Sequence, residues 1–182
     1  MGRFPYHEEI AQAADQHGIR ADLIAAIVQK ESGFNTWAMR VEPGWRWFVV
    51  GGDMRPLVAS PGLPMPPPGF RKPITAPSVS NNYTEWSHQR TSWGLMQVMG
   101  GVAREHRHIG WLSSLCDPER GLDVGCAHLG GYLSRYPEHE AIASYNVGPG
   151  NRMGDTGVEY CQSVMELERM LGQGGGEVHV LH

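Results

Sequence analysis

Glu31 is the residue whose type and position most clearly suggest chemistry. It is preceded at helical spacing by the apolar residues Leu23, Ile24, Ile27 and Val28. The same spacing places the Glu31 carboxyl group on the face expected to be buried, near the negative end of the helix dipole, and both conditions favour its protonated form. A carboxylic acid kept protonated near neutral pH can serve as the general acid that cleaves a glycosidic bond. The alternative is a helix-end Glu that turns into solvent, as most Glu residues do.

The elements that must position Glu31 are predicted to be helices. The sequence predicts one helix over about 6–17, ended by Gly18, and a second over about 21–31, ended by Ser32-Gly33. Helical spacing returns later in the chain, over about 95–106, 119–136, 139–145 and 155–171. The sequence therefore predicts a mainly α fold.

The segment 35–90 has a different composition, rich in proline and aromatic residues. Such a density of proline excludes a long helix or a central strand, and only 45–50 is expected to form one short strand. A loop of this length inside a compact domain is usually functional or disordered. The aromatic residues favour a packed, functional insertion, and disorder remains an alternative for about 61–68.

Length and composition limit the remaining possibilities. The 182 residues suit one domain, expected over 1–172 and followed by a flexible Gly-rich tail at 173–182. A net charge of −4 without a long basic run predicts no nucleic-acid partner, and no apolar stretch is long enough to span a membrane. The N-terminus lacks the apolar core of a signal peptide. We therefore expect a protein that is made in the cytoplasm and either acts there or is exported by another route. We also expect it to be a monomer.

The chain has three cysteines, which could pair in disulfides, and nine histidines, which could bind a metal. An odd number of cysteines without a signal peptide favours buried free thiols, with a Cys116–Cys126 pair as the alternative. His106, His108 and His128 lack a recognised zinc-ligand spacing. The sequence predicts neither a metal nor a cofactor.

Four segments in order carry a resemblance to a known family. They are Glu31-Ser32-Gly33, Thr91–Gln97, Ala143–Asn146 and Asp155–Tyr160. Together they resemble the soluble lytic transglycosylase family, which has the goose-lysozyme-like fold, over about 10–170 with the 35–90 insertion as an interruption. The resemblance implies a single lysozyme-like domain with little or no β-structure, and peptidoglycan glycan strands as the substrate. It extends to a subgroup with phage-associated members, so phage lysis or virion delivery is one expected route to the cell wall.

The resemblance assigns roles to individual residues. Glu31 matches the family's single catalytic acid/base. The positions that match its substrate-binding residues are Ser32, Leu95, Met96, Gln97, Tyr145, Asn146 and Tyr160. Asp155 stands where the family has Glu, so a contact made by that longer carboxylate is in doubt. From the insertion we add Trp45, Trp47, Glu85 and Trp86 as candidate residues of one wall of the glycan groove.

The implied reaction uses one carboxyl group twice. Glu31 would protonate the departing oxygen of the β-1,4 bond after N-acetylmuramic acid, and would then take the proton from the muramyl 6-hydroxyl. That hydroxyl closes a 1,6-anhydro ring, while the N-acetyl group stabilises the positive centre. Two alternatives stay open. One is a hydrolytic muramidase in which Glu42, Asp53 or Glu85 activates water, and the other is a catalytically silent glycan-binding module.

Overall fold

The computed structural model describes residues 4–172, so the predicted flexible tail at 173–182 lies outside the described residues. The chain forms two compact units. The first unit comprises the residues up to Asn35 together with those from Gly125 onward, and the second comprises Thr36–Val124. The single-domain interpretation of 1–172 stays a prediction.

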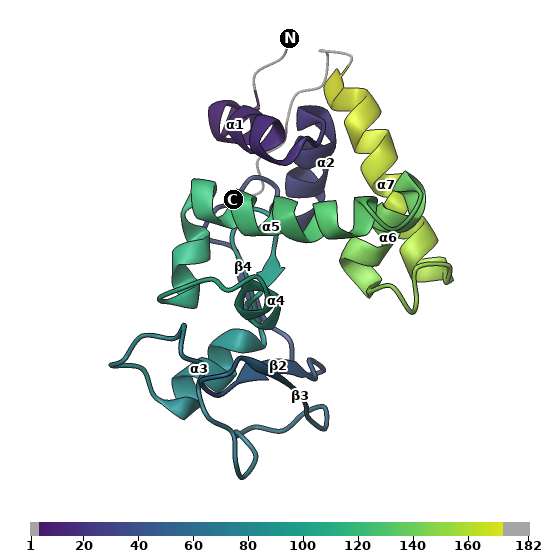
Figure 1. The fold of residues 1–182 in the computed structure, drawn as a ribbon. Helices are drawn as coiled ribbons and strands as arrows, with labels where there is room; N and C mark the ends of the chain where they lie inside the picture. Colours follow the sequence, from purple (N-terminus) through teal and green to yellow (C-terminus); the bar gives the residue numbers. More distant parts are fainter. Residues whose placement is uncertain (1–3, 173–182) are drawn as a thin grey trace. The chain divides into compact units, whose positions relative to one another are not determined.

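The first unit is entirely helical in its described part. It contains α1 (His7–His17), α2 (Ala21–Ser32), the end of α5 (Pro118–Leu133), α6 (Glu138–Val147) and α7 (Asp155–Gly172). α2 packs against both α1 and α7, and α6 packs against α7 (Figure 1). Six consecutive residues of α2, from Leu23 to Val28, are buried, so this helix is the centre of the unit. Ion pairs from Arg20 to Glu138 and Glu168, at 2.7 and 2.5 Å, add ties at the helix ends.

Glycine sets the ends of the two N-terminal helices, as the sequence predicted. Gly18 ends α1 with φ of 64°, and Gly33 ends α2 with φ of 58°. Both values lie in the left-handed region, where glycine has no Cβ to clash with the preceding turn. The boundary at Gly33 leaves Glu31 in the last turn of α2.

The second unit mixes short strands with short helices. β1 (Met39–Val41), β4 (Thr91–Trp93) and β5 (Val98–Met99) form one antiparallel sheet in the order β1-β4-β5. β2 (Trp47–Val50) pairs with β3 (Arg55–Val58) in a separate hairpin, with Phe48 opposite Leu57. The remaining elements are α3 (Asn82–Gln89), α4 (Gly100–Glu105) and the 3₁₀ helix η1 (Leu112–Cys116). The strand predicted within 45–50 is confirmed as β2.

The 35–90 insertion has its own small core. Trp86 stacks on Phe48 with ring centroids 3.9 Å apart and planes 9° apart, while Phe70 meets the edge of Trp86 at 5.3 Å. These rings, with Ala59, form a buried cluster under the hairpin. The prediction of a single short strand in this segment was incomplete, since β1, β3 and α3 also form there. Asn81 begins α3 by accepting a hydrogen bond from the Thr84 amide at 2.9 Å, a capping signal that the proline content obscured.

The helix predicted over 95–106 was wrong in its first half. Residues 95–97 form a turn, Val98–Met99 is β5, and the helix begins only at Gly100. Gln97 has φ of 48°, which a helix does not allow. Gly100 and Gly101 at the helix start are closely approached, because an added Cβ would lie 2.2 Å from the His88 carbonyl oxygen and 2.6 Å from that of Trp47. The apolar spacing reflected burial of a turn and a strand as well as a helix.

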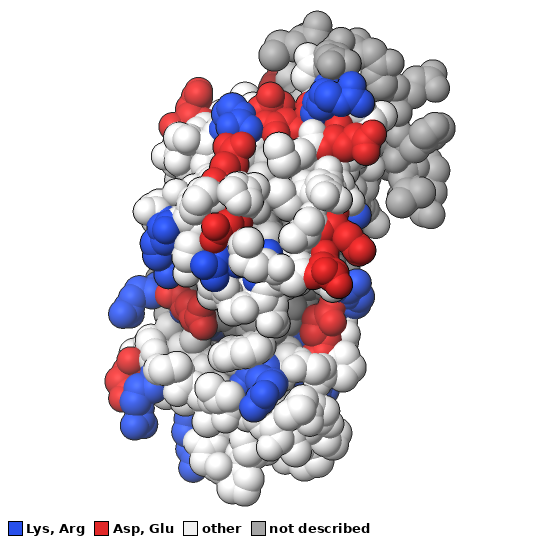
Figure 2. All heavy atoms as spheres, turned by 90° about the vertical axis from the view of Figure 1, so that its right-hand side faces the viewer, with Lys and Arg blue, Asp and Glu red and all other residues white. Residues whose placement is uncertain are grey.

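The hydropathy of the helices and the charge of the surface bear on two expectations, namely that the chain neither spans a membrane nor binds nucleic acid. No helix in residues 4–172 combines the length and apolar character needed to cross a bilayer. On the face drawn in Figure 2, acidic and basic side chains are interspersed. The expectation that nucleic acid is not a partner remains a prediction.

Candidate active site

Glu31 is held in the first unit by the end of α2. It lies one turn beyond the buried run Leu23–Val28 and two residues before Gly33, and its side chain is half-buried. Ser32 turns its hydroxyl back onto the helix, donating to the Val28 carbonyl oxygen at 3.1 Å. In this structure Ser32 therefore supports the last turn of α2.

Tyr160 of α7 makes the central contact with Glu31. Its hydroxyl donates to Glu31 Oε1 at 2.5 Å, across 129 residues of sequence. The Tyr160 side chain is buried, and its pKa is raised, first by loss of solvation and then by the negative charge of Glu31 and the hydrogen bond to it. Tyr160 therefore keeps its proton throughout the physiological range and acts as a hydrogen-bond donor to the carboxyl group.

Tyr145 of α6 is a second phenol in the surroundings of Glu31. Its pKa lies well above the ordinary value, mainly because of burial and next because of the charge of Glu31. The neighbouring Asn146 is exposed in the last turn of α6, which ends at Gly148 with φ of 75°. The structure thus brings Glu31, Tyr145 and Tyr160 together from three helices.

The loop between α6 and α7 is fixed by a residue that the sequence reasoning missed. Arg152 donates to Glu140 Oε2 at 2.6 Å and to the Pro149 carbonyl oxygen at 2.5 Å. Gly157 lets α7 approach this loop, since an added Cβ would lie 2.7 Å from the Arg152 carbonyl oxygen. The (i, i+12) spacing of Glu140 and Arg152 is no recognised motif, so no local pattern could have revealed the pair.

Asp155 lies at the start of α7, apart from these contacts. It is exposed in the first turn of the helix. Among the described residues it makes no ion pair. This exposed position agrees with the sequence-based expectation that the shorter Asp155 carboxylate lacks a contact made by the family's Glu.

The predicted groove residues Leu95, Met96 and Gln97 form a tight turn in the second unit. Leu95 and Met96 are 0% exposed, so the proposed contact of their side chains with a sugar is corrected. The Gln97 amide nitrogen donates to the Ala38 and Gly94 carbonyl oxygens at 3.0 and 2.9 Å, while its oxygen accepts from the Ser92 hydroxyl at 2.9 Å. In the structure Gln97 therefore bridges backbone groups, and its role toward a glycan stays a prediction.

Gly94 is required by the packing of the same turn. Its φ is 69°, and an added Cβ would lie 2.2 Å from the Leu115 carbonyl oxygen of η1. Thr36 ties the first residue of the unit to the same region by donating its hydroxyl to the Cys116 carbonyl oxygen. The glycine of the second motif is thus explained by backbone conformation and close approach.

A match to a known protein family identifies the family of this chain. Residues 8–162 match the Transglycosylase SLT domain. The chain belongs to the SLT transglycosylase family. It is therefore an enzyme that acts on peptidoglycan, and the mainly α, lysozyme-like fold predicted from the sequence is confirmed.

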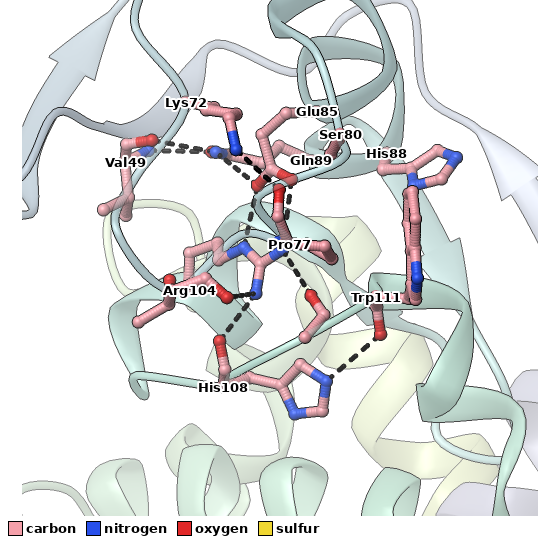
Figure 3. A network of polar contacts seen from close by, with 12 residues as sticks. Val49, Lys72, Pro77, Ser80, Glu85, His88, Gln89, Arg104, His108 and Trp111 are labelled. Carbon is pink, nitrogen blue, oxygen red and sulfur yellow. Dashed lines mark hydrogen bonds and ion pairs between the residues drawn. The ribbon is translucent and has the colours of Figure 1, made fainter.

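Glu85 of this SLT domain is a structural residue, which corrects its inclusion among the groove candidates. Its carboxylate forms a two-pronged pair with Arg104, at 2.7 and 3.0 Å, and the side chains are 2% and 0% exposed (Figure 3). Arg104 also donates to the carbonyl oxygens of His108 and Gly110, at 2.6 and 2.8 Å. Glu85 further accepts from the Gln89 amide at 3.1 Å. A carboxylate enclosed in this way does not meet solvent.

The three tryptophans proposed for the groove wall differ in exposure. Trp86 is 2% exposed inside the insertion core, so its proposed role as a sugar platform is corrected. Trp47 is 52% exposed, and Trp45 packs edge-on against it with ring centroids 5.4 Å apart. Trp45 also donates its indole N–H to the Trp47 carbonyl oxygen. A sugar-binding role for these two rings stays a prediction.

The other acids considered for water activation are paired within the second unit. Glu42 pairs with Arg40, and Asp53 lies 2.8 Å from Arg55 at an exposed position. Surface pairs of this kind hold a carboxylate only weakly. These pairs therefore do not decide whether Glu42 or Asp53 could activate water, and the hydrolytic alternative has to be tested through the product of the reaction.

The three cysteines are free and buried, which confirms the interpretation of free thiols. Within residues 4–172 no group of three or more His, Cys, Asp or Glu is arranged to hold a metal ion. Of the histidines considered as ligands, His106 is exposed, and His108 Nε2 lies 3.0 Å from the Ser114 hydroxyl. His128 packs against aromatic rings of the first unit. That the reaction needs no metal or cofactor remains a prediction.

Proposed function

We propose that this SLT domain is a lytic transglycosylase that cleaves the β-1,4 bond between N-acetylmuramic acid and N-acetylglucosamine, with Glu31 as its single acid/base. The observation that carries the proposal is the 2.5 Å hydrogen bond from Tyr160 to Glu31 at the end of α2. It gives the carboxyl group one defined orientation, which proton transfer to a bound sugar oxygen requires. Tyr145 supplies a second hydroxyl from α6 for the same surroundings.

The first step is protonation of the departing oxygen by Glu31. The carboxyl group loses its proton as the glycosidic bond breaks, and an oxocarbenium-like centre develops on the muramyl ring. The Tyr160 hydroxyl, which keeps its proton because its pKa is raised, stabilises the carboxylate formed at this moment. The muramyl N-acetyl oxygen stabilises the positive centre from within the substrate.

The second step uses the same carboxylate as a base. Glu31 takes the proton of the muramyl 6-hydroxyl, whose oxygen attacks the anomeric carbon and closes the 1,6-anhydro ring. The proton removed from the hydroxyl restores the acid for the next cycle, so no water is consumed. This cycle needs only one carboxyl group. The burial of Glu85 supports it, because Glu85 is one of the three acids that a hydrolytic reaction could use to activate water.

The product distinguishes this reaction from hydrolysis. Purified peptidoglycan digested by the enzyme should yield muropeptides lighter by one water than those of a hydrolase, and borohydride should leave their muramyl ends unchanged. Heavier products whose muramyl ends are reduced by borohydride would establish a muramidase. Glu42 and Asp53 would then be the acids to mutate, with Glu85→Gln as the buried comparison.

Delivery to the cell wall is a separate proposal. A phage lysis or virion role rests on the resemblance of the insertion-bearing chain to phage-associated members alone. Addition of purified protein to intact cells, compared with cells whose outer layers are permeabilised, would show whether it needs a delivery device. Equal lysis of both preparations would contradict that need.

A further inference from the structure

Arg135, two residues beyond the end of α5, packs its guanidinium against two aromatic rings. Its guanidinium carbon lies 5.4 Å from the ring centroid of Tyr132 and 5.9 Å from that of Tyr136. Its Nε donates to the Gly131 carbonyl oxygen at 2.6 Å, at the C-terminal end of the helix. These contacts fix the plane of the guanidinium.

The acids that follow Arg135 in sequence are occupied by other arginines. Glu138 pairs with Arg20 at 2.7 Å, and Glu140 pairs with Arg152 at 2.6 Å. Arg135 itself, which is exposed, makes no ion pair with a carboxylate of residues 4–172. The local charges are thus arranged so that one oriented guanidinium remains available to an anion from outside.

A row of rings connects this guanidinium to the surroundings of Glu31. The His128 ring lies 4.8 Å from Tyr132 and 5.8 Å from Tyr145, measured between centroids. The negative charge of Glu31 in turn helps to raise the pKa of Tyr145. His128 and Tyr132 are four residues apart on α5 and so share one face of the helix.

A carboxylate-bearing substituent of the substrate fits this chemistry. Muramyl residues carry stem peptides whose amino acids have free carboxylates. Arginine binds a carboxylate through two parallel N–H groups, and does so best where its plane is already fixed. We propose that Arg135, supported by Tyr132 and Tyr136, is a subsite for a stem-peptide carboxylate. This inference rests on the proposed function.

The test compares glycan strands that differ only in their stems. kcat/KM would be measured on uncrosslinked peptidoglycan strands and on the same strands after an amidase has removed the stem peptides. Arg135→Gln should lower kcat/KM about fivefold on strands with stems, the size expected of a charge-assisted contact at the surface. On stripped strands it should match the wild type. Arg135→Lys should recover part of the loss, because it keeps the charge without the two-pronged geometry.

The control is Arg169→Gln, which removes the same charge from an exposed position on α7 and should behave like the wild type on both substrates. Equal losses on both substrates for Arg135→Gln, or no loss on either, would overturn the subsite, as would an equal loss for Arg169→Gln. These outcomes differ from failure of the proposed function, in which the wild type would not yield anhydro ends from either substrate. A misfolded Arg135→Gln protein would leave the decision to Arg135→Lys, for which an intermediate loss confined to stem-bearing strands is required.

Discussion

The burial of the Glu85–Arg104 pair predicts a large effect from a small change. Glu85→Gln keeps the size of the side chain but removes its charge, and so leaves the Arg104 guanidinium charged in a place where it is 0% exposed. Breaking a buried pair by removing one partner costs about 3–5 kcal/mol. Arg104 keeps its hydrogen bonds to the His108 and Gly110 carbonyl oxygens, so we expect the lower end, about 3 kcal/mol.

A matched control separates burial from charge. Asp53→Asn removes a carboxylate from an exposed pair with Arg55 and should cost less than about 1 kcal/mol. Urea unfolding followed by tryptophan fluorescence suits the comparison, because Trp86 stacks on Phe48 in the core that α3 helps to build. Each variant would be measured with the wild type under the same conditions.

The same variant tests the assignment of Glu85 as structural. At a temperature where it remains folded, Glu85→Gln should form the same product as the wild type. A free energy of unfolding within about 1 kcal/mol of the wild type would refute the reasoning from burial. A change in the ratio of hydrated to anhydro ends would show that Glu85 takes part in the chemistry.

Three further predictions concern the candidate site, the turn at Gly94 and the effect of acid. Tyr160→Phe should lower kcat about 100-fold with little change in KM, because it removes one donor to the catalytic carboxyl; steady-state kinetics on soluble glycan strands would show it, and an unchanged kcat would contradict it. Gly94→Ala should destabilise the protein by at least about 2 kcal/mol in urea unfolding, because its φ is 69° and a backbone oxygen lies 2.2 Å from the added Cβ; wild-type stability would count against the close approach. Burial lowers the pKa of His88 and His108, so the unfolded chain binds protons that the folded chain does not, and stability should fall as the pH drops from about 7 to 5. Urea midpoints measured across this range would give the change of stability with pH, which should be smaller for His108→Gln. A wild-type stability that does not change with pH would contradict the burial effect.

The sequence was most informative where one residue type has one physical meaning. Gly18 and Gly33 ended α1 and α2 as predicted, because a left-handed residue at a helix end favours glycine. The apolar run before Glu31 correctly predicted a buried helix whose last turn carries a carboxyl group. That Tyr160 belongs to the site came only from the family resemblance, since nothing local links it to Glu31, 129 residues away.

The second unit shows where such reasoning fails. Gln97 adopts φ of 48°, a conformation that only the surrounding hydrogen bonds make favourable, so apolar spacing around it was misread as helix. Glu85 and Trp86 were assigned to the groove as a charged and a large aromatic residue in a proline-rich segment. Their burial depends on Arg104 and Phe48, partners far away in sequence. Pairwise burial of this kind carries no local signal.

The central claim is that Glu31 is the acid and base of the reaction, and Glu31→Gln tests it most directly. The amide oxygen can still accept the Tyr160 hydrogen bond, so the fold and glycan binding should be retained while the acidic proton is lost. Turnover of purified peptidoglycan by Glu31→Gln should fall by about 10² to 10⁴. Glu159→Gln, which changes an exposed acid beside Tyr160, should keep the wild-type rate. A folded Glu31→Gln protein that degrades peptidoglycan near the wild-type rate would contradict the account.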